Sequence, residues 1–193
     1  VRPSFFEWTV IMAFSFFKEQ KVDYAIIETG LGGRLDSTNI IKPLACLITN
    51  ISLDHQDLLG DTLEKIASEK AGIIKNNTPV TISEKQEDTS AVFMAKAASV
   101  NAPLQFAADL IEASGFTFTS PTWGEMTIKS PYQGQYQQKN IRGVLAWCEQ
   151  LQSIIPLEGD KIHKGIEKTR INTGLQGRWE ILGENPKVIA DTG

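Results

Sequence analysis

The chain has 193 residues, with 19 basic and 23 acidic side chains and a net charge of −4 at neutral pH. This small acidic excess argues against a general nucleic-acid-binding surface and is ordinary for a soluble enzyme. The apolar stretch at residues 5–17 is short and contains Glu7, so we expect neither a signal peptide nor a membrane span, and the cytoplasm is the default location. Cys46 and Cys148 lie in apolar surroundings and are expected to be free thiols.

The first elements in chain order are a helix over residues 5–17 and a strand over residues 22–27. Glu28 follows that strand and precedes a loop that contains three glycines. Ligands of open α/β sheets bind outside the carboxyl ends of the strands, so Glu28 is placed for a ligand or a metal ion. A carboxylate that only caps the turn is the alternative.

A second strand is expected over residues 44–49, and a helix begins near Thr62 and extends to residue 75. One apolar stripe of this helix consists of Leu63, Ile66, Ala67 and Ile74. Lys70 lies close to that stripe, where an unpaired ammonium group is costly. The lysine therefore needs a carboxylate partner, a route to water, or a modification that changes its charge.

The remaining pattern predicts further α/β units. Expected are a strand at 79–82, a helix at 87–100 and a strand at 104–106, followed by an antiparallel hairpin with strands near 116–118 and 126–128. Helices at 135–154 and 160–169, a loop at 170–177 and a strand at 187–190 complete the series. We predict an α/β fold with a doubly wound, mostly parallel sheet, flanking helices and a small antiparallel hairpin.

Two long motifs carry a resemblance to a known family. The first reads ETGLGGRLDSTNI at residues 28–40, and the second reads ITNISLDHQDLLGDTLEKIASEKAGIIK at residues 48–75. In this order and spacing they resemble the folylpolyglutamate synthase and dihydrofolate synthase family of the Mur ligase superfamily. The segments SFFEWT at 4–9, GRWE at 177–180 and VIADTG at 188–193 extend the similarity over nearly the whole chain.

The resemblance implies a particular domain organisation. Family members begin with a strand and a glycine-rich phosphate loop, and no GxxxxGK[ST] pattern occurs in these 193 residues. We therefore expect an internal fragment that lacks the N-terminal phosphate-loop unit and most of the C-terminal domain. Residues 1–175 would form part of the ATP-binding central domain, and residues 176–193 the junction and first strand of the C-terminal glutamate ligase domain.

The implied reaction joins L-glutamate to dihydropteroate, to folate (poly)glutamates, or to both of these acceptors. ATP phosphorylates the carboxylate to an acyl phosphate, and the amine of glutamate then attacks it. The resemblance also implies a monomer that acts on small molecules rather than on nucleic acid or membranes. Two alternatives remain: a muramyl-peptide ligase with the same chemistry, and a module that binds nucleotide or pterin without turnover.

The resemblance assigns Glu28, His55 and Lys70 to catalysis and to magnesium binding. Glu28 offers the oxygen ligand that Mg²⁺ prefers, whereas His55 taken alone would be interpreted as a hydrogen-bonding residue. Mn²⁺ suits a site with an imidazole ligand. Lys70 matches a lysine that is carbamylated by CO₂ in this superfamily, which converts a buried cation into an anion. The alternative for Lys70 is an ion pair with Glu69 or a helix neighbour.

The remaining assignments concern the nucleotide and the pterin. Asn140, Arg178 and Asp191 match nucleotide contacts: Arg178 for phosphate oxygens and Asp191 for ribose hydroxyls. Ser4, Phe6 and Asp36 match positions that hold dihydropteroate in bifunctional bacterial members. An aromatic ring offers the pterin a stacking face, and a carboxylate pairs with its amino-pyrimidinone edge. Equally, Phe6 suits a core position and Asp36 a turn. For Asn140 the alternative is a helix-surface amide, for Arg178 a surface ion pair, and for Asp191 a strand-end cap.

Overall fold

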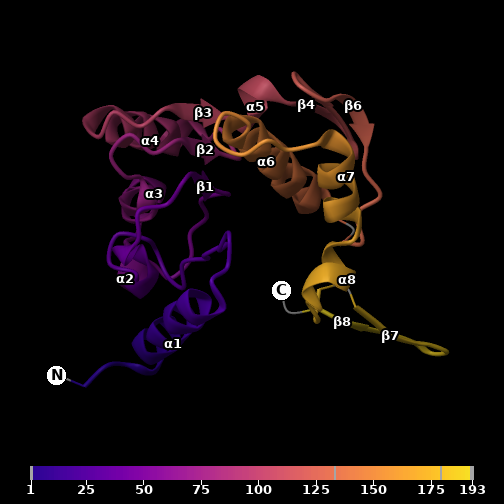
Figure 1. Cartoon of the computed structure of the whole chain (residues 1–193), viewed down its shortest axis with the longest axis horizontal. Helices are drawn as coiled ribbons and strands as arrows, with labels where there is room; N and C mark the ends of the chain where they lie inside the picture. The colour runs from indigo at the N-terminus through magenta and orange to yellow at the C-terminus, as the bar shows by residue number, and fades with distance from the viewer. Residues whose placement is uncertain (1, 133, 179, 192–193) are drawn as a thin grey trace. The chain divides into compact units, whose positions relative to one another are not determined.

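The computed structural model describes residues 2–132, 134–178 and 180–191 (Figure 1). The chain divides into two compact units whose segments alternate along the sequence. The first unit comprises Val1–Leu44, Ile51–Thr78 and Gln86–Pro103, and the second comprises Ala45–Asn50, Pro79–Lys85 and Leu104–Gly193. Among the described residues, none of the helices combines the length and hydrophobicity that a membrane span requires.

The first unit is helical. Its elements are α1 (Phe5–Gln20), the 3₁₀ helix η1 (Ser37–Ile40), α2 (Gln56–Leu59), α3 (Leu63–Lys70), the 3₁₀ helix η2 (Ala71–Ile73) and α4 (Glu87–Ser99). Polar side chains fix where the helices begin. Ser4 and Glu7 form a reciprocal capping box at α1, and the Thr62 hydroxyl accepts a hydrogen bond from the Lys65 amide at α3. The predicted helices at 5–17 and 87–100 are thus confirmed within a few residues.

The core of the first unit lies between α3 and α4, which pack against each other. Its fully buried side chains are Ile66, Ala67, Ile74, Phe93 and Ala97. The apolar stripe predicted for the second motif is therefore the buried face of α3. The helix itself is shorter than predicted, because it ends at Lys70 and continues as η2.

The strand predicted at residues 22–27 is wrong. This segment has no β-structure, and the side chains of Val22, Tyr24 and Ile26 are 44%, 59% and 79% exposed. An extended segment becomes a strand through ladder hydrogen bonds with a neighbour, and no strand in the described residues pairs with it. Glu28 consequently follows an exposed, unpaired segment rather than the end of a buried strand.

The second unit contains a parallel sheet of β1 (Cys46–Ile48), β2 (Val80–Ile82) and β3 (Leu104–Phe106). Cys46 lies opposite Val80, and Val80 lies opposite Leu104. Parallel strands require long connections, which here contain α2 and α3 between the first two strands and α4 between the next two. The three strands confirm the predictions at 44–49, 79–82 and 104–106.

The rest of the second unit is antiparallel sheet and helix. It contains α5 (Ala107–Leu110), β4 (Glu112–Ser114), β5 (Thr117–Ser120), β6 (Gly124–Thr127), α6 (Gln135–Leu151), α7 (Gly159–Glu167), α8 (Thr169–Thr173), β7 (Glu180–Glu184) and β8 (Lys187–Ala190). The predicted hairpin is confirmed as β5–β6, with β4 as an unpredicted third strand. The loop predicted at 170–177 is partly wrong, because α8 occupies its first residues and ends at Thr173, followed by Gly174 with a left-handed backbone.

One hydrophobic cluster holds α5, the antiparallel sheet and α6 together. Its buried members are Ala107, Ile111, Phe118, Ile128, Ile141, Leu145 and Ala146. Ile162 and Ile166 of α7 pack against this cluster, so α7 covers part of it. Cys46 is buried and Cys148 is half-buried, and burial, followed by the neighbouring charge of Glu149, raises the pKa of Cys148 to about 11.

Candidate functional site

A single carboxylate organises the first motif, residues 28–40, which we call the glycine-rich loop. One oxygen of Asp36 accepts hydrogen bonds from the amides of Gly30 and Leu31, at 2.8 and 2.9 Å. The other oxygen accepts from the amide and the hydroxyl of Thr38, and Asp36 caps η1. Asp36 is only 9% exposed, so this carboxylate is enclosed by the loop that it shapes. The alternative of a turn residue describes this geometry, while a pterin contact remains a prediction.

These hydrogen bonds make the loop sensitive to acid. Burial alone would raise the pKa of Asp36, but the hydrogen bonds from Thr38, Leu31 and Gly30 outweigh it and hold that pKa below its usual value. A lowered carboxyl pKa contributes stability that is fully present above the unfolded-state value of about 4. That contribution is lost as the pH falls through the lowered value of the folded state.

We expect Asp36→Asn to lower the free energy of unfolding by about 2–3 kcal/mol at pH 7, because an amide offers one oxygen and leaves buried donors unpaired. Urea unfolding at pH 7 and at pH 3 measures this. The difference between the parent and the variant should shrink at pH 3, because below the ordinary pKa of an aspartate the unfolded chain takes up a proton more readily than the folded one. Asp61→Asn, at an exposed carboxylate beside Lys65, is the control. A difference that does not depend on pH would contradict the assignment.

Two glycines let the loop approach the second motif closely. A Cβ atom at Gly33 would lie 2.9 Å from the carbonyl oxygen of Glu69 and 3.0 Å from that of Lys70. A Cβ at Gly32, which has φ +66°, would lie 2.8 Å from the side chain of Leu59 in α2. The loop therefore packs onto α2 and onto the end of α3, which brings the two sequence motifs into one structure.

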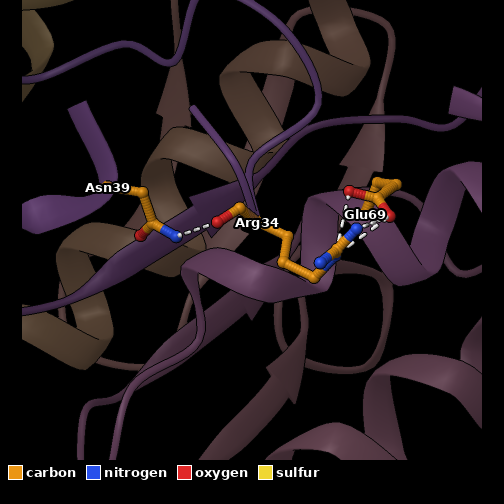
Figure 2. A network of polar contacts seen from close by, with 3 residues as sticks. All are labelled: Arg34, Asn39 and Glu69. Atoms are coloured by element: carbon orange, nitrogen blue, oxygen red, sulfur yellow. Dashed lines mark hydrogen bonds and ion pairs between the residues drawn. The ribbon is translucent and has the colours of Figure 1, made fainter. Parts of the chain in front are cut away.

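Polar contacts reinforce this packing (Figure 2). The guanidinium of Arg34 contacts both carboxylate oxygens of Glu69, at 2.9–3.2 Å, and the Arg34 amide donates to the Glu69 carbonyl at 2.8 Å. The amide side chain of Asn39 donates to the carbonyls of Arg34 and Gly72, at 3.2 and 3.1 Å. Sequence reasoning assigned no role to Arg34 or Asn39, although both lie inside the first motif.

The predicted metal-binding residues all belong to the first unit. Glu28 is exposed and lies two residues before Gly30, whose amide is held by Asp36. His55 precedes α2 with a left-handed backbone, φ 49°, and its ring is 3.7 Å from Asp54. Lys70 is the half-buried last residue of α3. Each side chain thus comes from a segment that contacts the glycine-rich loop or leads into it.

Glu69 is not the ion-pair partner of Lys70, because its carboxylate binds Arg34. Among the described residues the Lys70 ammonium forms no ion pair. No group of three His, Cys, Asp or Glu side chains in that part of the chain could hold a metal ion. The ligand types of Glu28, His55 and Lys70 would suit a metal ion if Lys70 were carbamylated, because the carbamate oxygens would add a third ligand to the Glu28 carboxylate and the His55 imidazole.

The predicted pterin residues are partly brought together. The ring of Phe6, 40% exposed, lies against Gly30, because a Cβ at Gly30 would be 2.5 Å from its Cζ atom. Phe6 and Asp36 therefore both contact Gly30. Ser4 lies at the start of α1, where its hydroxyl accepts a hydrogen bond from the Glu7 amide. In Ser4 the hydroxyl is thus already used as a helix cap.

The predicted nucleotide residues lie in the second unit. Asn140 is half-buried on α6 and its side chain donates to Gln137 at 3.3 Å. Glu180 pairs with Ala190 between β7 and β8, so Arg178 and Asp191 lie near the same end of this ribbon in the order of the chain. Arg178 and Asp191 are both exposed. The register thus puts two of the three residues near one end of the ribbon.

Glu180 stabilises the turn that carries Arg178. Its carboxylate accepts from the Gly177 amide at 2.8 Å and pairs with Arg170 at 2.8 Å. The Gly177 hydrogen bond, with a smaller contribution from Arg170, holds the pKa of Glu180 below its usual value despite partial burial.

Separately, a pocket of about 580 Å³ in the second unit is lined by none of the predicted site residues. Its lining residues are Trp123, Glu125, Met126, Thr127, Glu158, Gly159, Asp160 and His163.

Comparison with known families decides the evolutionary placement. Residues 5–148 match the model of the Mur ligase middle domain. The chain belongs to this family. The match covers both motifs and all three strands of the parallel sheet, so the loop, α3 and this sheet all lie within the Mur ligase middle domain.

The chain is similar in sequence to curated proteins over nearly its whole length. The chain is 34% identical to the dihydrofolate synthase/folylpolyglutamate synthase of Bacillus subtilis, over 98% of this chain and 46% of the relative. It is 32% identical to the folylpolyglutamate synthase of Lacticaseibacillus casei, over 96% of this chain and 45% of that protein. The chain thus spans about half the length of the curated relatives it matches.

Solved structures support the same placement. The apo form of L. casei FPGS matches with a TM-score of 0.86 and 30% identity, covering 98% of this chain and 48% of that one. E. coli FolC in complex with DHPP and ADP matches with a TM-score of 0.82 and 30% identity, covering 99% and 44%. An FPGS–AMPPCP–folate complex matches with a TM-score of 0.86 and 31% identity, covering 98% of this chain and 48% of that one. The predicted α/β fold is confirmed by these likenesses.

Proposed function

We propose that the protein carrying this chain is an ATP-dependent ligase that joins L-glutamate to dihydropteroate, to reduced folate (poly)glutamates, or to both. The observation that carries the proposal is the docking of the glycine-rich loop on the end of α3, through Gly33, Arg34 and Asn39. It gathers the segments of Glu28 and Lys70 into one structure, as an acyl-phosphate-forming site requires. The names of the B. subtilis and L. casei relatives support the substrate class.

In this proposal the carboxylate of the acceptor is first phosphorylated by ATP, with release of ADP. The amine of glutamate attacks the acyl phosphate, and phosphate leaves. The protein mainly positions the reactants and neutralises the developing charge. Residues 1–175 would belong to the ATP-binding central domain and residues 176–193 to the junction with a glutamate ligase domain. We further propose a monomeric, cytoplasmic enzyme, as the family resemblance implies.

Three side chains would hold magnesium in this enzyme: Glu28, His55 and a carbamylated Lys70. Bound Mg²⁺ would supply electrostatic stabilisation for the transferred phosphoryl group. The half-buried amine of Lys70 gains from carbamylation, because the anion suits a cation-binding site better than an ammonium group does. Mn²⁺ is expected to substitute, since an imidazole ligand suits it.

The nucleotide and the pterin would be held by separate groups. Arg178 would bind phosphate oxygens through its planar fork, Asp191 would accept hydrogen bonds from ribose, and Asn140 would contact the nucleotide from α6. Phe6 would stack on the pterin, with Asp36 and Ser4 beside it. Support for the pterin site comes from the contact of the Phe6 ring with Gly30, which places an exposed aromatic face at the glycine-rich loop.

We expect Glu28→Gln to raise the magnesium concentration needed for half-maximal activity about 10-fold, because an amide removes a negative charge from the ligand set. A magnesium titration of ADP formation in the full-length protein measures this. Glu112→Gln, at an exposed carboxylate of β4, serves as the control. An unchanged magnesium dependence in Glu28→Gln would remove Glu28 from the ligand set.

We expect Phe6→Ala to raise the KM for dihydropteroate about 10-fold and the KM for reduced folate glutamates by less, because a stacking face is lost. Steady-state kinetics with both acceptors measures the difference. Phe5→Ala is the matched control, since the neighbouring Phe5 ring is 89% exposed. Equal losses with both acceptors would count against a dedicated pterin site.

The decisive experiment measures ADP formation by the full-length protein with magnesium, glutamate and one acceptor at a time. Turnover that requires glutamate and dihydropteroate establishes synthase activity, and turnover with reduced folate establishes polyglutamylation. If a folded protein with an intact phosphate loop forms no ADP with either, the proposal fails. A muramyl-peptide acceptor, or binding of nucleotide or pterin without turnover, is then tested next.

A further inference from the structure

Arg34 and Glu69 are joined twice although 35 positions separate them. Their side chains form a two-pronged ion pair, in which Nε and Nη2 of Arg34 lie 3.0 and 2.9 Å from Oε1 of Glu69. Their main chains form a hydrogen bond of 2.8 Å from the Arg34 amide to the Glu69 carbonyl. Both the side chain and the main chain of Glu69 are thus bound by Arg34 of the glycine-rich loop.

The contacts of the loop bracket Lys70 on both sides. Glu69, which precedes it, is held by Arg34, and the carbonyl of Gly72, which follows it, accepts from Asn39 at 3.1 Å. The carbonyl of Lys70 itself lies against Gly33. Figure 2 shows Arg34 between Asn39 and Glu69, and residues 33–39 of the loop make all of these contacts. The first motif therefore contacts the main chain on both sides of Lys70 and at Lys70 itself.

Overall stability does not account for this pair. The side chain of Arg34 is 56% exposed and that of Glu69 is 24% exposed. Ion pairs this exposed add little to the stability of a fold, because water and salt screen them. The fixed fork of arginine, in contrast, defines an orientation that the point charge of lysine does not. The ion pair of Arg34 with Glu69 is thus better suited to orient these two residues than to stabilise the fold.

We propose that Arg34 and Glu69 are positioning residues for the ligase reaction: they orient the end of α3 so that Lys70 is presented to the reactants. This inference rests on the proposed function. Arg34 also occupies the one carboxylate adjacent to Lys70 in sequence, so that carboxylate does not pair with the lysine. Neither residue of the pair touches substrate, and both act through Lys70.

The test compares Arg34→Gln, Arg34→Lys, Glu69→Gln and the double variant in the full-length protein. We expect Arg34→Gln to lower kcat about 10-fold or more, since a small displacement of a reacting group is enough for such a loss. The KM for ATP should stay within about twofold and the thermal midpoint within about 3 °C of the parent, as an exposed pair implies. Arg34→Lys should recover part of the loss, because the charge remains.

The double variant tests whether the two residues act as one unit. Arg34→Gln combined with Glu69→Gln should be no slower than Arg34→Gln alone, since the second change removes a contact that is already lost. Lys65→Gln breaks the exposed pair of Lys65 with Asp61 on the same helix and should leave kcat unchanged.

Each other outcome overturns an identifiable part of the argument. A kcat within twofold of the parent in Arg34→Gln overturns the positioning role while leaving the proposed function in place. A loss of kcat that only follows a large drop in the thermal midpoint shows a structural role and likewise overturns it. Absence of ADP formation by the unsubstituted protein overturns the proposed function, and the positioning role with it.

Discussion

Replacing Lys70 with alanine is expected to lower kcat for ADP formation at least about 100-fold in the full-length protein, because preorganised charge at the transferring group is the main source of catalysis in such a site. Lys70 is half-buried at the end of α3 and forms no ion pair among the described residues, so the change leaves no charged partner stranded. The fold should therefore persist. Steady-state kinetics with saturating ATP and magnesium measures the loss, and circular dichroism verifies the fold.

Lys65→Ala is the matched control for this experiment. Lys65 belongs to the same helix but points to solvent, where it pairs with Asp61 at 2.7 Å. Turnover of this variant should stay close to that of the parent. If Lys70→Ala turned over at a similar rate, neither the carbamylated lysine nor the metal assignment at residue 70 could stand.

Replacing Gly72 with alanine is expected to lower the free energy of unfolding by about 3 kcal/mol, because the added methyl group collides with main chain rather than with a flexible side chain. A Cβ at Gly72 would lie 2.3 Å from the Cα atom and 2.7 Å from the amide nitrogen of Arg34. The loop must then move away from Gly72, which also breaks the hydrogen bond from Asn39 to the Gly72 carbonyl. Urea unfolding of the parent and the variant measures the effect.

Gly165→Ala provides the comparison. Gly165 lies within α7, and a Cβ there would meet nothing within 4 Å. Alanine is the better helix former, so this variant should gain stability of about 0.5–1 kcal/mol. Equal unfolding curves for the two glycine variants would mean that Arg34 does not approach Gly72 as closely as described.

Local patterns were sufficient to predict many elements. The strands expected at 104–106 and 187–190 match β3 and β8 to the residue, and the capping side chain Thr62 marked the start of α3. The strand expected at residues 22–27 was wrong for a non-local reason: its composition suits a strand, yet pairing depends on a neighbour that sequence periodicity does not reveal. β4 was missed because its residues, Glu-Ala-Ser, are exposed and carry no apolar alternation.

The site was predictable in its residue types but not in its contacts. The motif around Asp36 predicted a polar loop, whereas the four hydrogen bonds to that carboxylate emerged only from the folded geometry. The ion pair of Arg34 with Glu69 spans 35 positions, and nothing local marks either residue as the partner of the other. The spacing of Gly32 and Gly33 was the available signal, since adjacent glycines often mark a close approach of two backbones.

The packing of the glycine-rich loop also fixes its length. Ordinary surface loops accept insertions and deletions, because few of their residues contact the rest of the protein. Here successive residues meet different partners: Gly32 meets α2, Gly33 meets the end of α3, and Arg34 meets Glu69. Adding or removing one residue would shift every one of these pairings at once. In divergent copies of this chain, changes of length should therefore accumulate elsewhere, such as in the exposed turn of β4 and β5 around Gly115, where no neighbouring atom is close.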